Sequence, residues 1–304
     1  MSKIKNIVRR QLIPGHLTES KSLLGIVALA IVYLVWGSTY LAIKVAVRGD
    51  GALPPLALGA LRMGLASAVL FGLAAARGEY LKLSPRQLFR SASAGTLLWL
   101  GGNGLVILSL TRIDSGLAAV LMATTPIWLA LIVALKKRRL PTVKHGLSIA
   151  LGFVGVIVLI AWNSGATVAI DEIGIALVLG AALCWALGSL IPAATPSPMV
   201  NAASVLWFAS IGFAIASGIG GENVSMPSAE ALWALSYLVI VGSAIGFGAY
   251  TIAVARLPMS LIMTHASVNP LVAVVLGFFF AGEALSIGTA IAAGLIMVSV
   301  PLSK

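Results

Sequence analysis

The sequence has few charged residues. Lys, Arg, Asp and Glu make up 10% of its 304 residues, whereas a soluble domain carries roughly 25%. Hydrophobic residues account for 60%, and the mean hydropathy is +1.06. This composition excludes an ordinary soluble domain and indicates an all-α integral membrane protein, with room for about ten helical spans of about 20 residues each.

Cysteine and histidine are also scarce. Cys184 is the only cysteine, so no intramolecular disulfide can form. The histidines are His16, His145 and His265, and no metal-ligand spacing occurs, which argues against a metal site and a membrane-embedded enzyme. The nucleotide-binding motif GxxxxGKS or GxxxxGKT is absent, which argues against ATP-driven transport. We therefore expect no catalytic residues, no metal and no cofactor.

Ten apolar runs follow a polar, basic segment at residues 1–22, which we expect at the cytoplasmic surface. The runs predict membrane-spanning helices over residues 23–47, 56–76, 91–110, 115–135, 144–162, 172–191, 200–219, 230–252, 259–281 and 285–302. The connections are short, so we expect one bundle of antiparallel neighbours without a separate soluble domain.

The distribution of basic residues predicts the orientation. With ten spans and a cytoplasmic N-terminus, 16 Lys and Arg residues fall in inner segments and three in outer segments, namely Lys44, Arg48 and Arg112. Cytoplasmic loops are enriched in Lys and Arg, so both termini are predicted to be cytoplasmic. Topology thus explains the net charge of +11, and the expected partners are the lipid bilayer and a small-molecule substrate, with no nucleic acid.

One stretch has a diverged copy later in the chain. Residues 112–131 read RIDSGLAAVLMATTPIWLAL and residues 256–275 read RLPMSLIMTHASVNPLVAVV. Arg112 matches Arg256 and Pro126 matches Pro270, both at an offset of 144 residues. The copy predicts two five-helix repeats, residues 23–162 and 172–302, of which the second is inverted because it starts after an odd number of crossings. Two repeats in one chain predict a monomeric functional unit.

The runs VWGSTYLAIK (35–44) and ALRMGLASA (60–68), together with the two proline-centred stretches, resemble the EamA-type carriers of the drug/metabolite transporter superfamily. The chain is similar to exporters of amino acids in this superfamily, including aromatic amino-acid exporters of the YddG type. The resemblance implies ten helices in two inverted repeats, a central cavity and export by alternating access across a bacterial inner membrane. The alternatives are an exporter of other metabolites or drugs, and a lipid-handling or scaffold protein without transport activity.

Polar and aromatic residues recur at the middle of the predicted spans. By the helical rise, Trp36, Asn103, Thr125, Trp185 and Asn269 lie in the middle third of a membrane core about 30 Å thick. They come from five different runs and predict a midplane substrate site, although each side chain could instead only pack between helices. The predicted pathway residues are Tyr33, Trp36, Tyr40, Trp99, Asn103, Met122, Thr125, Trp185, His265, Ala266 and Asn269.

The two prolines predict helix kinks. A proline leaves the carbonyl four residues earlier without its usual donor. Pro126 and Pro270 therefore free the carbonyls of Met122 and Ala266, and these could bind a substrate ammonium group. The alternative is a kink without a role in binding.

Three ionisable residues inside predicted spans are candidates for gating or coupling. His265 could carry protons near neutral pH, or be a neutral hydrogen-bonded residue. Lys44 and Arg62 lie in the outer third of their spans, where Asp114 or Glu283 could pair with them. Both side chains could instead extend to the membrane surface.

Overall fold

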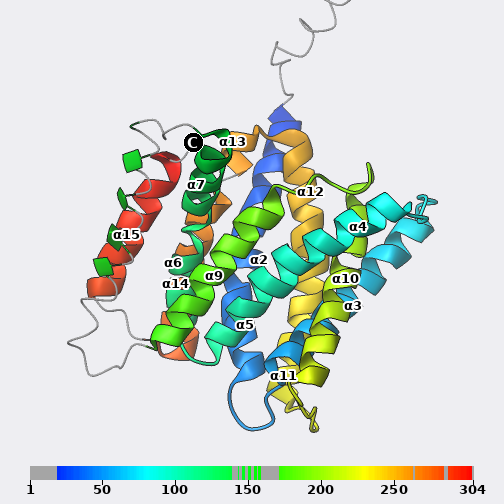
Figure 1. Ribbon diagram of the computed structural model, residues 1–304, viewed down its shortest axis with the longest axis horizontal. Coiled ribbons are helices and arrows are strands. Elements are labelled where there is room, and N and C mark those ends of the chain that lie inside the picture. Colours follow the sequence, from blue (N-terminus) through cyan, green and yellow to red (C-terminus); the bar gives the residue numbers. More distant parts are fainter. Residues whose placement is uncertain are drawn as a thin grey trace, which may run out of the picture.

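The computed structural model describes residues 19–138, 143, 146–147, 150–151, 154–155, 157–158, 171–262, 264–283 and 287–302. Within these residues the chain forms helices and no strands (Figure 1). The helices of the first half are α2 (Glu19–Val47), α3 (Pro55–Ala76), α4 (Pro85–Ala94), η1 (Gly95–Asn103), α5 (Gly104–Leu110), α6 (Ser115–Met122) and α7 (Thr125–Lys137). Those of the second half are α9 (Glu172–Ser189), α10 (Pro198–Ile219), α11 (Ala229–Tyr237), η2 (Leu238–Ile245), α12 (Gly246–Arg256), α13 (Met259–Ile262), α14 (His265–Ala281) and α15 (Ile287–Leu302).

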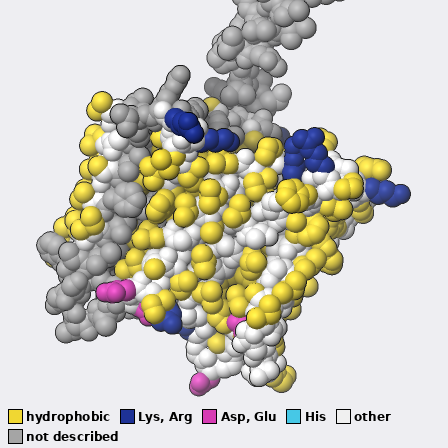
Figure 2. All heavy atoms as spheres, in the orientation of Figure 1, with side chains coloured by type: hydrophobic (Ala, Val, Ile, Leu, Met, Phe, Trp, Pro, Cys, Tyr) yellow, Lys and Arg dark blue, Asp and Glu magenta, His cyan; other side chains and the backbone are white. Residues whose placement is uncertain are grey.

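Seven helices among the described residues are long and apolar enough to cross a membrane, and Val268–Ala281 is a shorter apolar helix. Their outer faces carry exposed apolar side chains: Trp233 is 77% and Phe280 76% exposed. Figure 2 shows hydrophobic side chains along the flank of the bundle. These features indicate a multi-pass membrane protein. Most of the predicted span 144–162 and the segment 1–18 lie outside the described residues.

The helix starts follow local sequence rules. Ser84 and Gln87 form a capping box at the start of α4, with Pro85 in the first turn. The helix therefore begins six residues before the predicted start of the third span at residue 91. At the start of α9, Asp171 accepts a hydrogen bond from the Gly174 amide and so caps the helix.

The two halves exchange helix partners in a regular pattern. In the first half, α2 packs against α12 and α14; in the second, α9 packs against η1, α5, α6 and α7. Other contacts also join the halves, among them those of α3 with α10 and of α6 with α14. The α3–α10 contact is close because the buried Phe213 ring occupies the space that Gly59 leaves free, at 2.5 Å from where a Cβ would lie.

The first helices of the two halves run in opposite directions, and the two ends of the bundle differ in charge. Helix α2 begins at the upper end of the bundle in Figure 1, whereas α9 begins at the lower end, where α2 ends. An ion pair between Arg112 and Asp171 places the start of α9 beside the loop before α6. Figure 2 shows Lys and Arg side chains gathered at the upper end and Asp and Glu side chains at the lower end.

Two π-helical segments occupy corresponding positions in the halves. Residues 95–103 form η1, and η2 covers residues 238–245. Adding the repeat offset of 144 to the bounds of η1 gives residues 239–247, which overlap η2 almost completely. Segments of π-helix are rare and occur frequently at functional sites. The sequence analysis did not predict them.

Both proline-centred stretches are interrupted, but not where the prolines alone predict. In the first stretch the helix stops at Ala123 and Thr124, and Pro126 lies in the first turn of α7. In the second stretch the interruption lies just before His265, and Pro270 lies inside α14. A proline is tolerated in the first turn of a helix because its missing N–H would have no partner there.

Candidate functional site

The first group of predicted pathway residues is an aromatic cluster on α2, α12 and α14. The Trp36 ring stacks on Tyr250 with centroids 5.2 Å apart, and the His265 ring lies edge-on at 5.3 Å. Tyr33 lies one turn nearer the start of α2 than Trp36, and its hydroxyl forms a hydrogen bond with Thr264. All these side chains are half-buried, as is Tyr40 farther along α2.

The second group is an aromatic pair on η1 and α9. The rings of Trp99 and Trp185 meet edge to face with centroids 5.5 Å apart. Trp36 lies in the first predicted span and Trp185 in the sixth, so each lies in the first span of its half. Each contacts an aromatic ring on the third predicted span of the opposite half, Tyr250 for Trp36 and Trp99 for Trp185. The exchange of helix partners therefore produces two related aromatic contacts.

The interruption between α6 and α7 brings together two more predicted residues. The Thr125 hydroxyl donates to the Met122 carbonyl at 2.7 Å, so this carbonyl already has a donor. In the second stretch the Asn269 Oδ1 atom is buried and has no hydrogen-bond partner among the described residues. Ala266 lies one residue after the start of α14.

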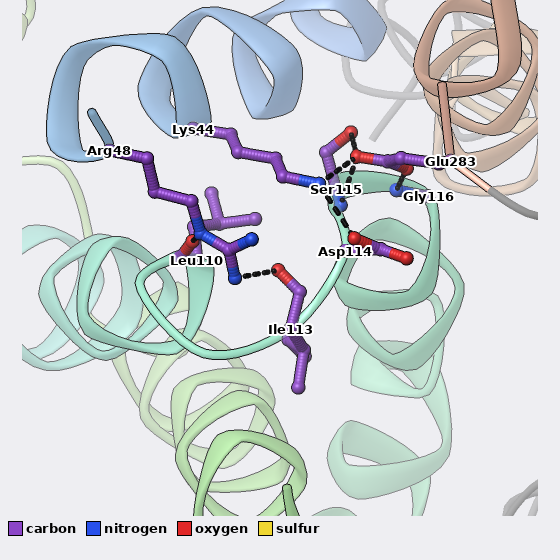
Figure 3. Close-up of polar contacts among 8 residues, drawn as sticks. All are labelled: Lys44, Arg48, Leu110, Ile113, Asp114, Ser115, Gly116 and Glu283. Carbon is purple, nitrogen blue, oxygen red and sulfur yellow. Dashed lines mark hydrogen bonds and ion pairs between the residues drawn. The ribbon is translucent and has the colours of Figure 1, made fainter. Parts of the chain in front are cut away.

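Figure 3 shows an ion-pair network at the end of the bundle where α2 finishes. Lys44 Nζ lies 2.6 Å from Asp114 Oδ1 and 2.7 Å from Glu283 Oε1. Glu283 also accepts hydrogen bonds from the Ser115 and Gly116 amides and from the Ser115 hydroxyl. Nearby, Arg48 donates to the carbonyls of Leu110 and Ile113. The predicted pairing of Lys44 with these carboxylates is confirmed.

Glu283 supplies the N-terminal cap of α6 from a distant part of the chain. Asp114 occupies the cap position but forms no side-chain cap bond, because its carboxylate pairs with Lys44. The Glu283 carboxylate instead lies at the positive end of the helix dipole. Burial raises the pKa of Glu283, but the hydrogen bonds from Lys44, Gly116 and Ser115 outweigh burial and lower it overall. Gly277 makes the fit possible, since a Cβ there would lie 2.2 Å from Glu283 Oε2.

The contacts of Arg62 differ from those that the sequence predicts. Its side chain is 4% exposed and forms no ion pair with Asp114 or Glu283. The guanidinium lies between η1 and η2, where Nη1 is 3.5 Å from Asn103 Oδ1. The reason is positional: Arg62 lies on α3, which packs against η2 and α5 rather than against the start of α6.

The structure therefore distributes the predicted residues over separate groups. Trp99 meets Trp185, Trp36 meets His265, and Arg62 meets Asn103. Sequence reasoning missed Tyr250, Ser115 and Gly277. Tyr250 could have been noticed as an aromatic residue inside an apolar span, but Ser115 and Gly277 have ordinary side chains whose contacts depend on tertiary structure.

This arrangement of long apolar helices, interrupted at matching places and joined by buried polar contacts, defines a multi-pass membrane transporter. The EamA-like transporter family matches the chain twice, at residues 23–161 and 172–303. The chain belongs to this family, which forms part of the drug/metabolite transporter superfamily.

Individual relatives agree. The chain is 35% identical over 283 residues to the uncharacterized inner membrane transporter YedA of Escherichia coli K12, covering 90% of this chain and 89% of YedA. It is 25% identical over 277 residues to the uncharacterized transporter YvbV of Bacillus subtilis, covering 89% and 87% of the two chains. One crystal structure superimposes with a TM-score of 0.61 at 20% identity, covering 94% of this chain and 97% of the other, which shows a shared fold.

Proposed function

We propose that this transporter exports small amphipathic metabolites, amino acids and their aromatic members in particular, from the cytoplasm across the bacterial inner membrane. The related aromatic contacts, Trp36–Tyr250 and Trp99–Trp185, carry the proposal. They place half-buried aromatic faces on helices of both halves. Such faces stack on flat apolar groups and attract ammonium groups by cation–π interaction.

We further propose ten membrane-spanning helices in two inverted repeats, residues 23–162 and 172–302, with both termini in the cytoplasm. The opposite directions of α2 and α9 and the exchange of helix partners support the inversion. The clustering of Lys and Arg at the end where α2 begins supports the orientation (Figure 2). The expected functional unit is one chain.

The Lys44–Asp114–Glu283 network is the proposed outer gate. It joins the end of α2, the start of α6 and the turn after α14, so it ties the two repeats together on the outer side. Alternating access requires these contacts to separate when the transporter opens outward. His265 remains the candidate for proton coupling, because it contacts Trp36 inside the bundle.

The test is counterflow of radiolabelled phenylalanine and leucine into proteoliposomes, with and without a pH gradient. We expect uptake by the wild type and a loss of roughly 2- to 10-fold in Trp36→Ala and Trp99→Ala, since an aromatic stacking contact is worth about 0.5–1.5 kcal/mol. Trp233→Ala is the matched control, because Trp233 is 77% exposed on the outer surface, and should transport normally.

Three outcomes would each count against one part of the proposal. Wild-type protein that moves no amino acid contradicts the substrate class. Equal loss in Trp36→Ala and Trp233→Ala means that the aromatic cluster supports folding rather than substrate. A pH effect that persists in His265→Ala removes His265 from coupling.

A further inference from the structure

Arg62 stands apart from the other basic residues in the lower half of the described bundle. Lys44 has two carboxylate partners, Arg112 pairs with Asp171, and Arg48 donates to two backbone carbonyls. Arg62 is the most buried of them at 4% exposure. Nevertheless, it forms no ion pair within the part of the chain that the structure describes, and its Nε atom is buried without a hydrogen-bond partner there.

The hydrogen bond that Arg62 forms is long, and its partner carries no charge. Its Nη1 atom lies 3.5 Å from Asn103 Oδ1, at the limit of hydrogen-bonding distance. An amide oxygen supplies a partial charge only, so it leaves most of the guanidinium charge uncompensated. A buried charge without a counter-ion is strongly unfavourable in a membrane protein, and such residues commonly mark substrate or ion pathways.

The surroundings of Arg62 include both π-helical segments. Asn103 is the last residue of η1, and Gly242 lies in the middle of η2, where an added Cβ would be 3.6 Å from Arg62 Nη2. Gly242 thus brings the η2 backbone close to the guanidinium, and the Thr39 methyl lies on the same side, 3.2 Å from that Cβ position. Trp99 lies about one turn before Asn103 in η1 and contacts Trp185, so the aromatic pair and the polar contact of Arg62 share one π-helical segment.

We propose that Arg62 binds the carboxylate of the transported solute, with Asn103 as a neighbouring polar contact and the Trp99–Trp185 pair facing its apolar part. This inference rests on the proposed function and narrows the substrate class to organic carboxylates with an apolar or aromatic group. Guanidinium pairs with carboxylate through two parallel hydrogen bonds. A bound carboxylate would supply both the missing charge and an acceptor for Nε. Amines without a carboxylate lack this contact.

The test is equilibrium dialysis of radiolabelled phenylacetate and phenethylamine against protein in nanodiscs, with empty nanodiscs to correct for partition into lipid. The two probes share a ring and differ in charge. We expect the wild type to bind phenylacetate at least about 10-fold more tightly than phenethylamine. Arg62→Met should weaken phenylacetate binding roughly 30-fold or more, since it removes one partner of a buried pair, and leave phenethylamine unchanged.

Two further variants separate binding from folding. Arg77→Met changes an exposed arginine at the end of the same helix and should bind both probes like the wild type. Arg62→Lys keeps the charge but loses the paired hydrogen bonds, so it should bind phenylacetate several-fold more weakly than the wild type and more tightly than Arg62→Met. Should Arg62→Met fail to fold, Arg62→Lys decides: an unchanged affinity for phenylacetate overturns the proposal.

The inference is also overturned when wild-type protein binds phenylacetate no better than phenethylamine, or when Arg62→Met keeps the wild-type affinity. Phenylalanine counterflow on the same samples distinguishes this failure from failure of the proposed function. Transport without selective phenylacetate binding refutes the role of Arg62 alone. Selective binding without amino-acid transport supports the carboxylate site and refutes the proposed substrate.

Discussion

Removal of the Glu283 side chain should destabilise the end of the bundle where α2 finishes. Glu283 accepts hydrogen bonds from Lys44, the Ser115 amide, the Ser115 hydroxyl and the Gly116 amide. Loss of a helix cap costs about 1 kcal/mol, and loss of a hydrogen bond to a charged group about 2 kcal/mol. We therefore expect Glu283→Ala to lower the free energy of unfolding by about 3 kcal/mol. The loss should not be larger, because Lys44 keeps Asp114 as its partner.

The assay is thermal unfolding in detergent. Unfolding is monitored by the reaction of a thiol-specific fluorophore with Cys184, which is the only cysteine in the sequence and is half-buried. A loss of about 3 kcal/mol corresponds to a Tm decrease of roughly 5–10 °C. Glu230→Ala is the control, since Glu230 is exposed in the first turn of α11 and its replacement should change stability by less than about 0.5 kcal/mol. Equal Tm values for the two variants would refute the argument that Glu283 caps α6 and pairs with Lys44.

Three further predictions concern the same network. Gly277→Ala should lower Tm by several degrees, because its Cβ would lie 2.2 Å from Glu283 Oε2. Gly294→Ala is the control, since no atom of a described residue lies within 4 Å of its Cβ position, and similar Tm values would contradict the packing argument. Ser115→Ala removes the hydroxyl donor to the Glu283 carboxylate but keeps the amide, so the expected loss is about 2 kcal/mol, measured by the same assay. The pKa of Glu283 is lower than its ordinary value of about 4.5. The contribution of this carboxylate to the free energy of unfolding should therefore be complete above about pH 4.5 and decline as the pH falls through the lowered pKa. If Tm falls below about pH 5 in the same way in Glu283→Gln, this carboxylate is not the cause of the pH dependence.

The sequence alone was sufficient for the membrane class, the family resemblance and most helix positions. Helix positions follow from hydropathy, because a backbone in lipid must satisfy its hydrogen bonds within a helix, and runs such as 56–76 or 200–219 therefore match α3 and α10 within one or two residues. The offset of 144 between Pro126 and Pro270 predicted interruptions in both stretches. Their positions were less predictable, since a proline can occupy the first turn of a new helix as well as the interior of an old one.

Tertiary structure alone decided which residues meet. Spacing along one helix placed Lys44 near a surface, but only the packing of α6 against α14 brought Glu283 to it. Arg62 had the same predicted depth and charge as Lys44, yet its guanidinium lies between two π-helical segments that no local sequence pattern predicted. The physical reason is that hydropathy and charge act on each span separately, whereas a contact depends on the rotation and partner of two helices at once.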